Sequence, residues 1–319
     1  MSAARPPEGA KAPPGGSDPC AAGERGGLVR AARPPEGAKA PPGGSDPCAT
    51  GERGGLVRAD TLPKVVLSAL ATPEQDVRVG LVAITRHGVA HALRLGALLP
   101  QAHLCTSGKF GALVQGAANP LHIFEGDMGA QMAALMQRFD QLVFFVSLGA
   151  VVRLIAPHLK SKDEDPGVIV VDDAAQFVIP VLSGHVGGAN EWSGRVADLL
   201  GATPVLTTAS DVGRTIPVDI LGRHLGWRVE APKINITRVS AHVVNGEPIA
   251  VVQEAGSPHW WTRPTPLPDN IRRFARLDDV DLDHYRAVLW ITHAEVPPAL
   301  WQQLHERLVV YRPPQEGAP

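Results

Sequence analysis

Short apolar runs separated by stretches with helical spacing are the feature that most limits how this chain can fold. Residues 79–84, 142–147 and 168–171 are near-continuous apolar runs, which are typical of strands buried on both faces. Between these runs, residues 88–99 and 129–139 carry apolar side chains at helical intervals. Strands that alternate with helices form mostly parallel sheets. We therefore predict an α/β fold, with a Rossmann-like, mostly parallel sheet covered by helices on both faces.

The same alternation continues along the chain. We predict further strands at residues 102–105, 177–182 and 204–208, and helices at residues 151–155 and 189–200. Residues 172–175 carry turn formers and are predicted to join strands 168–171 and 177–182.

A second, smaller α/β domain is predicted towards the C-terminus. Its strands are expected at residues 249–252, 287–291 and 308–311, and the proline-rich residues 257–269 are expected to form a long loop. We place the boundary near residues 214–222, so that the two domains span residues 59–216 and 217–319.

The first 58 residues differ from the rest because they consist almost entirely of a repeat. Residues 3–30 and 31–58 are copies of one 28-residue unit, and they differ only at Ala22 and Thr50. Each copy has five prolines, six glycines and no aromatic residue, so it cannot bury enough apolar surface to offset the entropy of ordering. We expect residues 1–58 to be disordered, either as a duplicated tail without activity or as a flexible tether.

Composition excludes several classes of protein. A formal net charge of −2 argues against a nucleic-acid partner. Three cysteines, of which Cys20 and Cys48 lie in the repeat, argue against a disulfide framework and favour a cytoplasmic location. The longest apolar run, residues 142–157, contains Arg153 and is too short to cross a bilayer. The N-terminus also lacks the apolar segment of a secretory signal.

Common catalytic and nucleotide-binding motifs are missing. The chain has no G-x-G-x-x-G after its first predicted strand, no Walker A loop, no H-E-x-x-H and no C-x-x-C. Ser183 does not lie in a G-x-S-x-G elbow. The chemistry must therefore come from other residues.

Three polar segments each follow a predicted strand, and we expect them to converge in one cleft. They are residues 147–150, 183–191 and 207–211. Ligands of open α/β sheets bind beyond the carboxyl ends of the strands. The glycines of the second segment would let the backbone approach a ligand, and the following helix start would offer N–H groups to an anion.

His185 is the first catalytic candidate, because an imidazole in a glycine-rich loop can act as a general base near neutral pH. A histidine that caps a helix is the alternative. Glu191 lies in the first turn of the predicted helix, and Asp172 with Asp173 is either a carboxylate pair or a pair of turn formers. The candidates for substrate binding are Gly149, Arg153, Lys162, Ser183, Gly184, Gly187, Gly188, Asn190, Thr207, Thr208 and Asp211.

Aromatic residues of the proline-rich loop are a further candidate surface. His259, Trp260 and Trp261 could pack on a flat macrocycle, or they could cover the core.

Residues 149–212 contain several linked motifs, which are, in order, VVRLIAP, K-x-x-D-P, VVDD, LSGHVGGAN and GATPVLTTASD. Together they resemble the signature region of the CbiG family, the cobalt-precorrin-5A hydrolases of cobalamin biosynthesis. A looser likeness extends over residues 79–312, the N-terminal and central regions of the family. The chain departs from the family at Asp173, where a glutamate is usual, and in ending where a C-terminal module commonly begins.

The resemblance implies a chemistry and a set of roles. The family opens the δ-lactone of a ring-contracted cobalt tetrapyrrole and releases acetaldehyde, giving cobalt-precorrin-5B. His185 would activate the water, and the N–H groups of Gly187 and Gly188 would receive the oxyanion. Asp172 or Glu191 would orient His185 or move the second proton, and Arg153 and Lys162 would bind substrate carboxylates. No cofactor and no protein-bound metal are expected, because cobalt arrives within the substrate.

Alternatives remain open at this stage. The chain could instead be a non-catalytic subunit that binds the corrinoid and needs a separately encoded C-terminal partner. A nucleotide-binding enzyme on a Rossmann-like sheet has only fold analogy in its favour. A homodimer is compatible with the sequence, and no membrane partner is expected.

Overall fold

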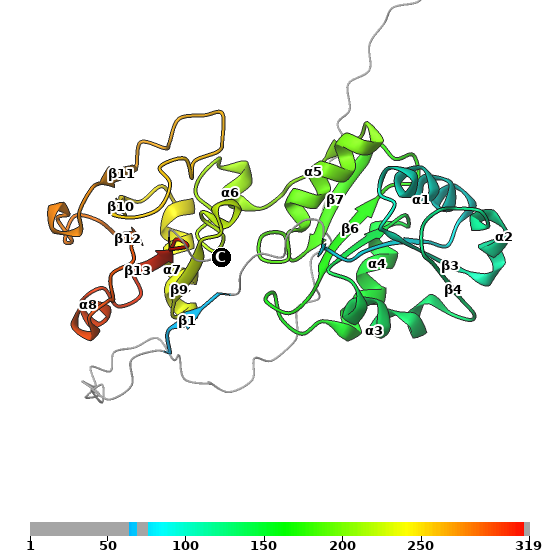
Figure 1. Cartoon of the computed structure of the whole chain (residues 1–319), viewed down its shortest axis with the longest axis horizontal. Coiled ribbons are helices and arrows are strands. Elements are labelled where there is room, and N and C mark those ends of the chain that lie inside the picture. The colour runs from blue at the N-terminus through cyan, green and yellow to red at the C-terminus, as the bar shows by residue number, and fades with distance from the viewer. Residues whose placement is uncertain (1–63, 69–75, 316–319) are drawn as a thin grey trace, which may run out of the picture. The chain divides into compact units, whose positions relative to one another are not determined.

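The computed structural model describes residues 64–68 and 76–315 (Figure 1). The duplicated leader, predicted to be disordered, lies outside these residues, together with Cys20 and Cys48. Residues 57–319 form one unit, and its described strands are arranged in two sheets. The prediction of an α/β fold with mostly parallel sheets is confirmed.

The first sheet has seven strands in the order β4-β3-β2-β5-β6-β7-β8. All neighbouring strands are parallel except β6 and β7. The central strands are fully buried, as their near-continuous apolar sequences predict. The strands are β2 (Val79–Ala83), β3 (His103–Ser107), β4 (Leu121–Phe124), β5 (Gln141–Phe144), β6 (Gly167–Val171), β7 (Phe177–Leu182) and β8 (Thr203–Pro204).

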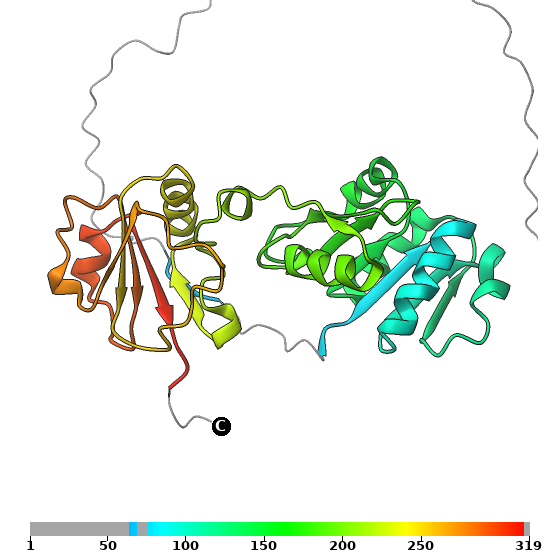
Figure 2. The ribbon, with the colours of Figure 1, turned by 90° about the horizontal axis from the view of Figure 1, so that it is seen from above.

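Helices cover both faces of this sheet (Figure 2). Helices α1 (Arg86–Leu98) and α5 (Ala189–Leu200) bury Val89, Leu95 and Val196 against one face. Helices α3 (Met128–Arg138) and α4 (Leu148–Ile155) bury Met132 and Val151 against the other. Shorter helical turns are η2 (Gly108–Phe110), α2 (Gly111–Val114) and η3 (Ala156–His158).

The tight turn between β6 and β7 reverses the chain. The Asp172 carboxylate accepts hydrogen bonds from the backbone N–H groups of Ala174 and Phe177, at 3.2 and 2.6 Å. Strand β7 therefore runs back along β6, and Leu182 pairs with Val168 near the start of β6. The segment after β7 consequently lies at the edge where the parallel strands begin.

This reversal overturns the expected convergence of the three polar segments. Residues 183–191 come after β7, and residues 207–211 come after β8, which is parallel to β7. Both segments lie at the edge where β5 and β6 begin. Residues 147–150 come after β5 and lie at the opposite edge, the same edge as Asp172.

The second sheet has six strands in the order β1-β9-β13-β12-β10-β11. Strands β10 to β13 are parallel wherever they pair with one another. Strand β9 is antiparallel to both of its neighbours, β13 and β1. Helix α7 (Lys233–Val244) packs on β12 and β13. The strands are β1 (Val66–Leu67), β9 (Arg228–Ala231), β10 (Ile249–Gln253), β11 (Ile271–Phe274), β12 (Ala287–Ile291) and β13 (Leu308–Arg312), and the remaining helical elements are α6 (Ala209–Val212), η4 (Arg223–Leu225), η5 (Leu277–Asp279) and α8 (Pro298–Gln303).

Three details differ from or add to the predictions. Strand β1 lies within the predicted N-terminal domain, residues 59–216, yet it pairs with β9 of the second sheet. The predicted strand 204–208 is shorter than expected, because the chain leaves the sheet after Pro204 and begins α6 at Ala209. Residues 257–269 form a loop without helix or strand, as predicted.

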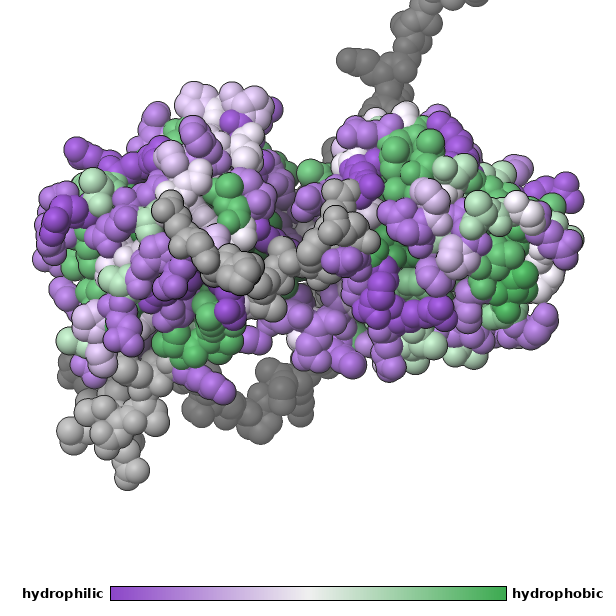
Figure 3. Space-filling view, viewed as in Figure 1, coloured by the Kyte–Doolittle hydropathy of each residue, from purple (hydrophilic) through white to green (hydrophobic). Residues whose placement is uncertain are grey.

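The surface of the described residues combines polar and apolar regions (Figure 3). The outer edge strand β4 exposes Leu121 and Ile123. None of the described helices is both long enough and apolar enough to cross a membrane.

Candidate active site

The loop between β7 and α5, residues 183–188, forms the base of the candidate site. Ser183 and Gly188 both have positive φ, of 53° and 79°, and Gly188 is the N-cap of α5. A Cβ at Gly187 would lie 2.4 Å from the Ser183 Cβ, so glycine is needed there for the loop to fold on itself. Gln141, at the start of β5, donates a hydrogen bond to the Gly187 carbonyl and ties the loop to the sheet.

His185 lies between two carboxylates. Its Nε2 atom is 3.3 Å from Asp211 Oδ2, and its Nδ1 atom is 3.1 Å from Asp219 Oδ1. Ser210 Oγ lies 3.1 Å from the same Nε2 atom. The imidazole is only 18% exposed, so neither carboxylate is strongly screened by water.

This arrangement sets the charge of His185. The hydrogen bonds to Asp211 and Asp219 outweigh desolvation and raise the pKa of His185 to about 9. At neutral pH the ring is therefore an imidazolium whose two N–H groups donate to the two carboxylates. A protonated imidazole has no free lone pair, so in this state His185 can donate a proton but cannot accept one.

Asp211 is the centre of the hydrogen-bond network. Its carboxylate accepts from Asn190 Nδ2 at 2.8 Å and from Arg263 Nη2 at 2.9 Å, as well as from the Thr208 hydroxyl. These bonds, with that of His185 as the largest cause, hold the pKa of Asp211 well below its usual range. The group is a permanent anion that fixes the position of the imidazolium.

The partner on the other side, Asp219, belongs to the segment that leads into the second sheet. The hydroxyl of Tyr311, a fully buried residue of β13, donates a hydrogen bond of 2.8 Å to the carbonyl of the preceding residue, Val218. This bond anchors the backbone next to Asp219 on the second sheet, while His185 is anchored on the first.

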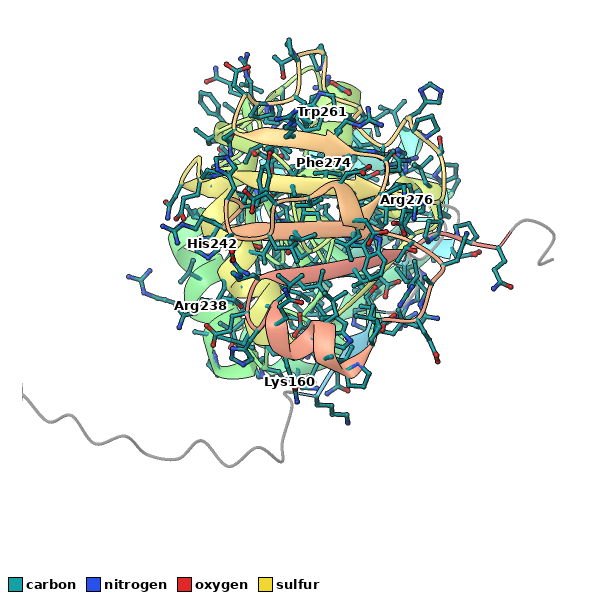
Figure 4. All side chains as sticks on the ribbon, turned by 90° about the vertical axis from the view of Figure 1, so that its left-hand side faces the viewer. Lys160, Arg238, His242, Trp261, Phe274 and Arg276 are labelled. Carbon is teal, nitrogen blue, oxygen red and sulfur yellow. The ribbon has the colours of Figure 1, made fainter. Side chains whose placement is uncertain are left out.

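A cleft of about 1710 Å³ borders this network. Trp261, Arg223 and Glu191 are among its lining residues, together with Gly187, Gly188, Asp211, Lys160, Trp260 and Arg263. Trp261, labelled in Figure 4, is half-buried. Its indole N–H donates to the Thr265 carbonyl at 2.6 Å. Of the three aromatic candidates, Trp260 and Trp261 line the cleft, whereas His259 is exposed and lies outside the lining. Trp260 is only 3% exposed and also packs into the core.

The structure brings together more than half of the sequence-predicted site residues. Asn190 donates to both Thr208 and Asp211, which joins the two segments at the β7 edge of the sheet. Glu191 is exposed and lines the cleft, whereas Thr207 is exposed and has no hydrogen bond or ion pair among the described contacts. The residues placed in or beside the His185 loop are Ser183, Gly184, His185, Gly187, Gly188, Asn190, Glu191, Thr207, Thr208 and Asp211.

Other predicted site residues lie elsewhere. Asp172 caps the β6–β7 turn, so it cannot orient His185 as expected, and Asp173 pairs with His87 at 3.2 Å. Arg153 donates within its own helix to the Gly149 carbonyl at 2.9 Å, at the opposite edge from His185. Lys162 is exposed on the segment before β6 and is outside the lining of the cleft.

One predicted oxyanion donor is already engaged. The Gly188 N–H donates to the His185 carbonyl at 2.9 Å. It therefore closes the loop and is not free to receive a substrate oxygen in this structure.

Three residues of the network were not predicted from the sequence: Asp219, Arg223 and Arg263. Asp219 and Arg223 lie in the connection between α6 and β9, and Arg263 lies in the loop between β10 and β11, so none of them falls in a signature motif. Only the folded chain places Asp219 and Arg263 beside Asp211 and His185.

Comparison with known proteins agrees with the signature motifs. A family model for the N-terminal region of cobalamin synthesis protein G matches residues 130–211, and one for the central region of cobalamin biosynthesis proteins matches residues 216–313. The chain belongs to the CbiG family. The resemblance inferred from the sequence is thereby confirmed.

Two curated relatives show how far this likeness extends. A protein of Priestia megaterium, named cobalt-precorrin-5A hydrolase, is 43% identical over 233 residues, which are 73% of this chain and 62% of the relative. A protein of the same name from Salmonella typhimurium is 31% identical over 241 residues, 72% of this chain and 64% of the relative. The chain therefore matches less than two thirds of the length of either protein.

A solved structure was also compared. The crystal structure of a Sulfolobus solfataricus homolog of cobalamin biosynthesis protein G covers 74% of this chain and 60% of that chain, with 18% identity and a TM-score of 0.41.

Proposed function

We propose that this chain catalyses the hydrolysis of cobalt-precorrin-5A. It would open the δ-lactone of the ring-contracted cobalt tetrapyrrole and release acetaldehyde, giving cobalt-precorrin-5B. The observation that carries the proposal is the His185 imidazolium, held between Asp211 and Asp219 beside a cleft of about 1710 Å³. The 43% identity to a relative of that name supports it.

The cleft suits a large, acidic ligand. Pockets for drug-sized molecules measure roughly 300–1,000 Å³, so this cleft has room for a tetrapyrrole with its side chains. Two cations of its lining, Lys160 and Arg223, pair with no carboxylate among the described residues. They would attract the acetate and propionate groups that such a substrate carries. Cobalt would enter as part of the substrate.

Lactone opening requires one proton acceptor and one proton donor. Water adds to the lactone carbonyl carbon and loses a proton, and the C–O bond of the ring breaks to leave an alkoxide that must gain a proton. Glu191 is exposed in the cleft and would accept the proton of the water. His185 would release its longer hydrogen bond, to Asp211, and donate that proton to the leaving alkoxide, which reverses the general-base role predicted from the sequence.

Acetaldehyde release then requires the opposite transfer at His185. The new hydroxyl group loses its proton, the bond between the carbinol carbon and the macrocycle breaks, and the electron pair passes into the macrocycle. His185, neutral after the first step, would accept that proton and become an imidazolium again. Glu191 would return its proton to the macrocycle, so both groups regain their starting states.

Anaerobic incubation of the purified chain with cobalt-precorrin-5A tests the proposal. We expect acetaldehyde, trapped as its hydrazone, to appear in amounts equal to the substrate consumed, with a matching loss of mass from the corrinoid. Binding of the corrinoid without acetaldehyde would overturn the proposal in favour of a non-catalytic binding subunit.

Compartment and partners belong to the same proposal. A reducing cytoplasm is consistent with Cys105, a buried free thiol whose pKa burial raises to about 12. A separately encoded C-terminal module and a second copy of this chain are the proposed protein partners. Acetaldehyde assays with and without the C-terminal module, and mass measurement in solution, would test these two.

A further inference from the structure

Arg223 is held next to His185 in an unusual way. It begins the turn η4, and its Nη1 atom donates to the carbonyl oxygens of His185 at 3.0 Å and of Val186 at 2.8 Å. The guanidinium is thus fixed to the backbone of the catalytic loop itself. Its charge lies beside the residue that we propose to act in the reaction.

The turn that carries Arg223 is rigidly built. Gly222 and Gly226 flank it, both with positive φ, and a Cβ at Gly222 would lie 2.1 Å from the ring of Trp227. The buried Trp227 side chain therefore sets the position of the turn against the core. Arg223 is presented from a fixed backbone, which lowers the entropy cost of binding a ligand there.

Half of the guanidinium remains available. A guanidinium has five N–H groups, and the Nη1 atom carries two of them. The Nε and Nη2 atoms donate no hydrogen bond within residues 64–68 and 76–315, and no carboxylate there pairs with Arg223. The Nε–Nη2 edge presents parallel N–H groups, the geometry that binds a carboxylate through both of its oxygens.

Other arginines near the cleft are already neutralised. Arg263 forms an ion pair with Asp211 at 2.9 Å. Arg78 donates to Asp140 through both Nε and Nη2, at 3.0 and 2.7 Å. Arg223 also lines the cleft and is half-buried, yet it has a charge without a partner among the described residues. A half-buried cation without a partner is costly, because it has lost part of its hydration, so an anionic group of a ligand in the cleft would bind there favourably.

We propose that Arg223 binds a peripheral carboxylate of the substrate through its Nε–Nη2 edge and so positions the macrocycle beside His185. This rests on the proposed function for the identity of the ligand as an acid-decorated cobalt tetrapyrrole. Arg223 then determines specificity, because an esterified or amidated macrocycle cannot form the paired, charged hydrogen bonds.

The test uses two stable probes. One is cobyrinic acid, a cobalt corrin whose side chains end in free carboxylates, and the other is its methyl-esterified counterpart. Kd is measured for each from quenching of tryptophan fluorescence, in the full chain and in the variants R223Q and R223K. R238Q serves as the matched control: Arg238 is an exposed arginine of α7, paired with Glu306 and outside the cleft lining (Figure 4).

We expect R223Q to raise the Kd for the acid by roughly tenfold or more and to leave the Kd for the ester within about twofold. R223K restores the charge without the paired geometry, so its Kd for the acid should lie between those of the wild type and R223Q. R238Q should match the wild type with both probes.

Three results would overturn the assignment. If R223Q weakens both probes equally, Arg223 only supports the loop, and if it weakens neither, Arg223 does not bind the ligand. If the wild type binds neither corrinoid, the proposed function fails and the assignment fails with it. Acid binding that depends on Arg223, without acetaldehyde release in the hydrolysis assay, would refute the proposed catalysis alone.

Discussion

Removal of the charge at His185 should change how the stability of the protein depends on pH. Hydrogen bonds to Asp211 and Asp219 raise the pKa of His185 from 6.5 to about 9. The unfolded chain lacks these carboxylate partners, so folding is favoured as long as the imidazole is protonated in the folded state. The difference in pKa corresponds to about 3 kcal/mol of unfolding free energy.

The sign of the effect is set by the raised pKa. The stabilisation is fully present below pH 6.5, the ordinary pKa, and is lost as the pH rises through about 9. In H185Q the residue does not titrate, and this contribution is absent at every pH. The difference in unfolding free energy between wild type and H185Q should therefore shrink by about 3 kcal/mol between about pH 6 and about pH 10.

Urea denaturation at a series of pH values measures this difference directly. Subtraction of H185Q cancels the groups that titrate equally in both proteins. D219N removes one of the two carboxylates, so the pKa of His185 falls. The unfolding free energy of D219N, taken relative to that of H185Q, should therefore change less with pH than that of the wild type does. A difference that stays constant within about 0.5 kcal/mol across the whole range, or an NMR titration of His185 centred near 6.5, would refute the reasoning.

Three further changes probe the loop, the two edges of the first sheet and the network. G188A should cost about 1–2 kcal/mol of unfolding free energy, because φ at Gly188 is +79°, and an unchanged urea midpoint would argue against this loop conformation. E191Q should lower kcat by about 100-fold with little change in KM. Asp173 is an exposed carboxylate at the opposite edge of the first sheet, so D173N should change neither constant. Equal losses of kcat in the two variants would contradict the assignment of edges. N190A removes the hydrogen bonds to Thr208 and Asp211 and should destabilise the protein by about 1–3 kcal/mol, measured by the same denaturation.

Much of the fold was predictable because local pattern and burial agree. The apolar run at residues 79–84 contains β2, and the runs at residues 142–147 and 168–171 overlap β5 and β6, each of which begins one residue earlier; these strands are buried on both faces as expected. Helix α5 begins at Ala189, directly after the glycine-rich segment. The strand predicted at residues 204–208 was too long, because apolar character alone does not show where a strand leaves the sheet.

The main error in the sequence prediction concerned the direction of strand β7 relative to β6. The four-residue turn at residues 172–175 is predictable from its turn formers, and a turn this short can only return the chain antiparallel to β6. Treating the end of β7 as equivalent to the carboxyl ends of the parallel strands put residues 147–150 and His185 at the same edge. The information needed to separate them was present in the sequence.

The candidate site was only partly predictable for a different reason. His185 and Asn190 lie in the motif LSGHVGGAN, and Asp211 lies in GATPVLTTASD. Both the motifs and the chemistry of these side chains therefore predicted a role in the site. Asp219 and Arg263 are single charged residues in irregular segments, and their roles come from contacts across long stretches of sequence. The proton state of His185 was also beyond sequence reasoning, because it depends on both carboxylates lying within 3.3 Å of the ring.

Single-turnover release of acetaldehyde from cobalt-precorrin-5A, compared in the wild type and H185Q with corrinoid saturating, is the most direct test of the account. We predict that the wild type forms acetaldehyde in step with loss of the lactone, while H185Q still binds the corrinoid but forms acetaldehyde at least about 100-fold more slowly. Equal rates in the two proteins would contradict the account, because the charged imidazole would then have no part in the reaction.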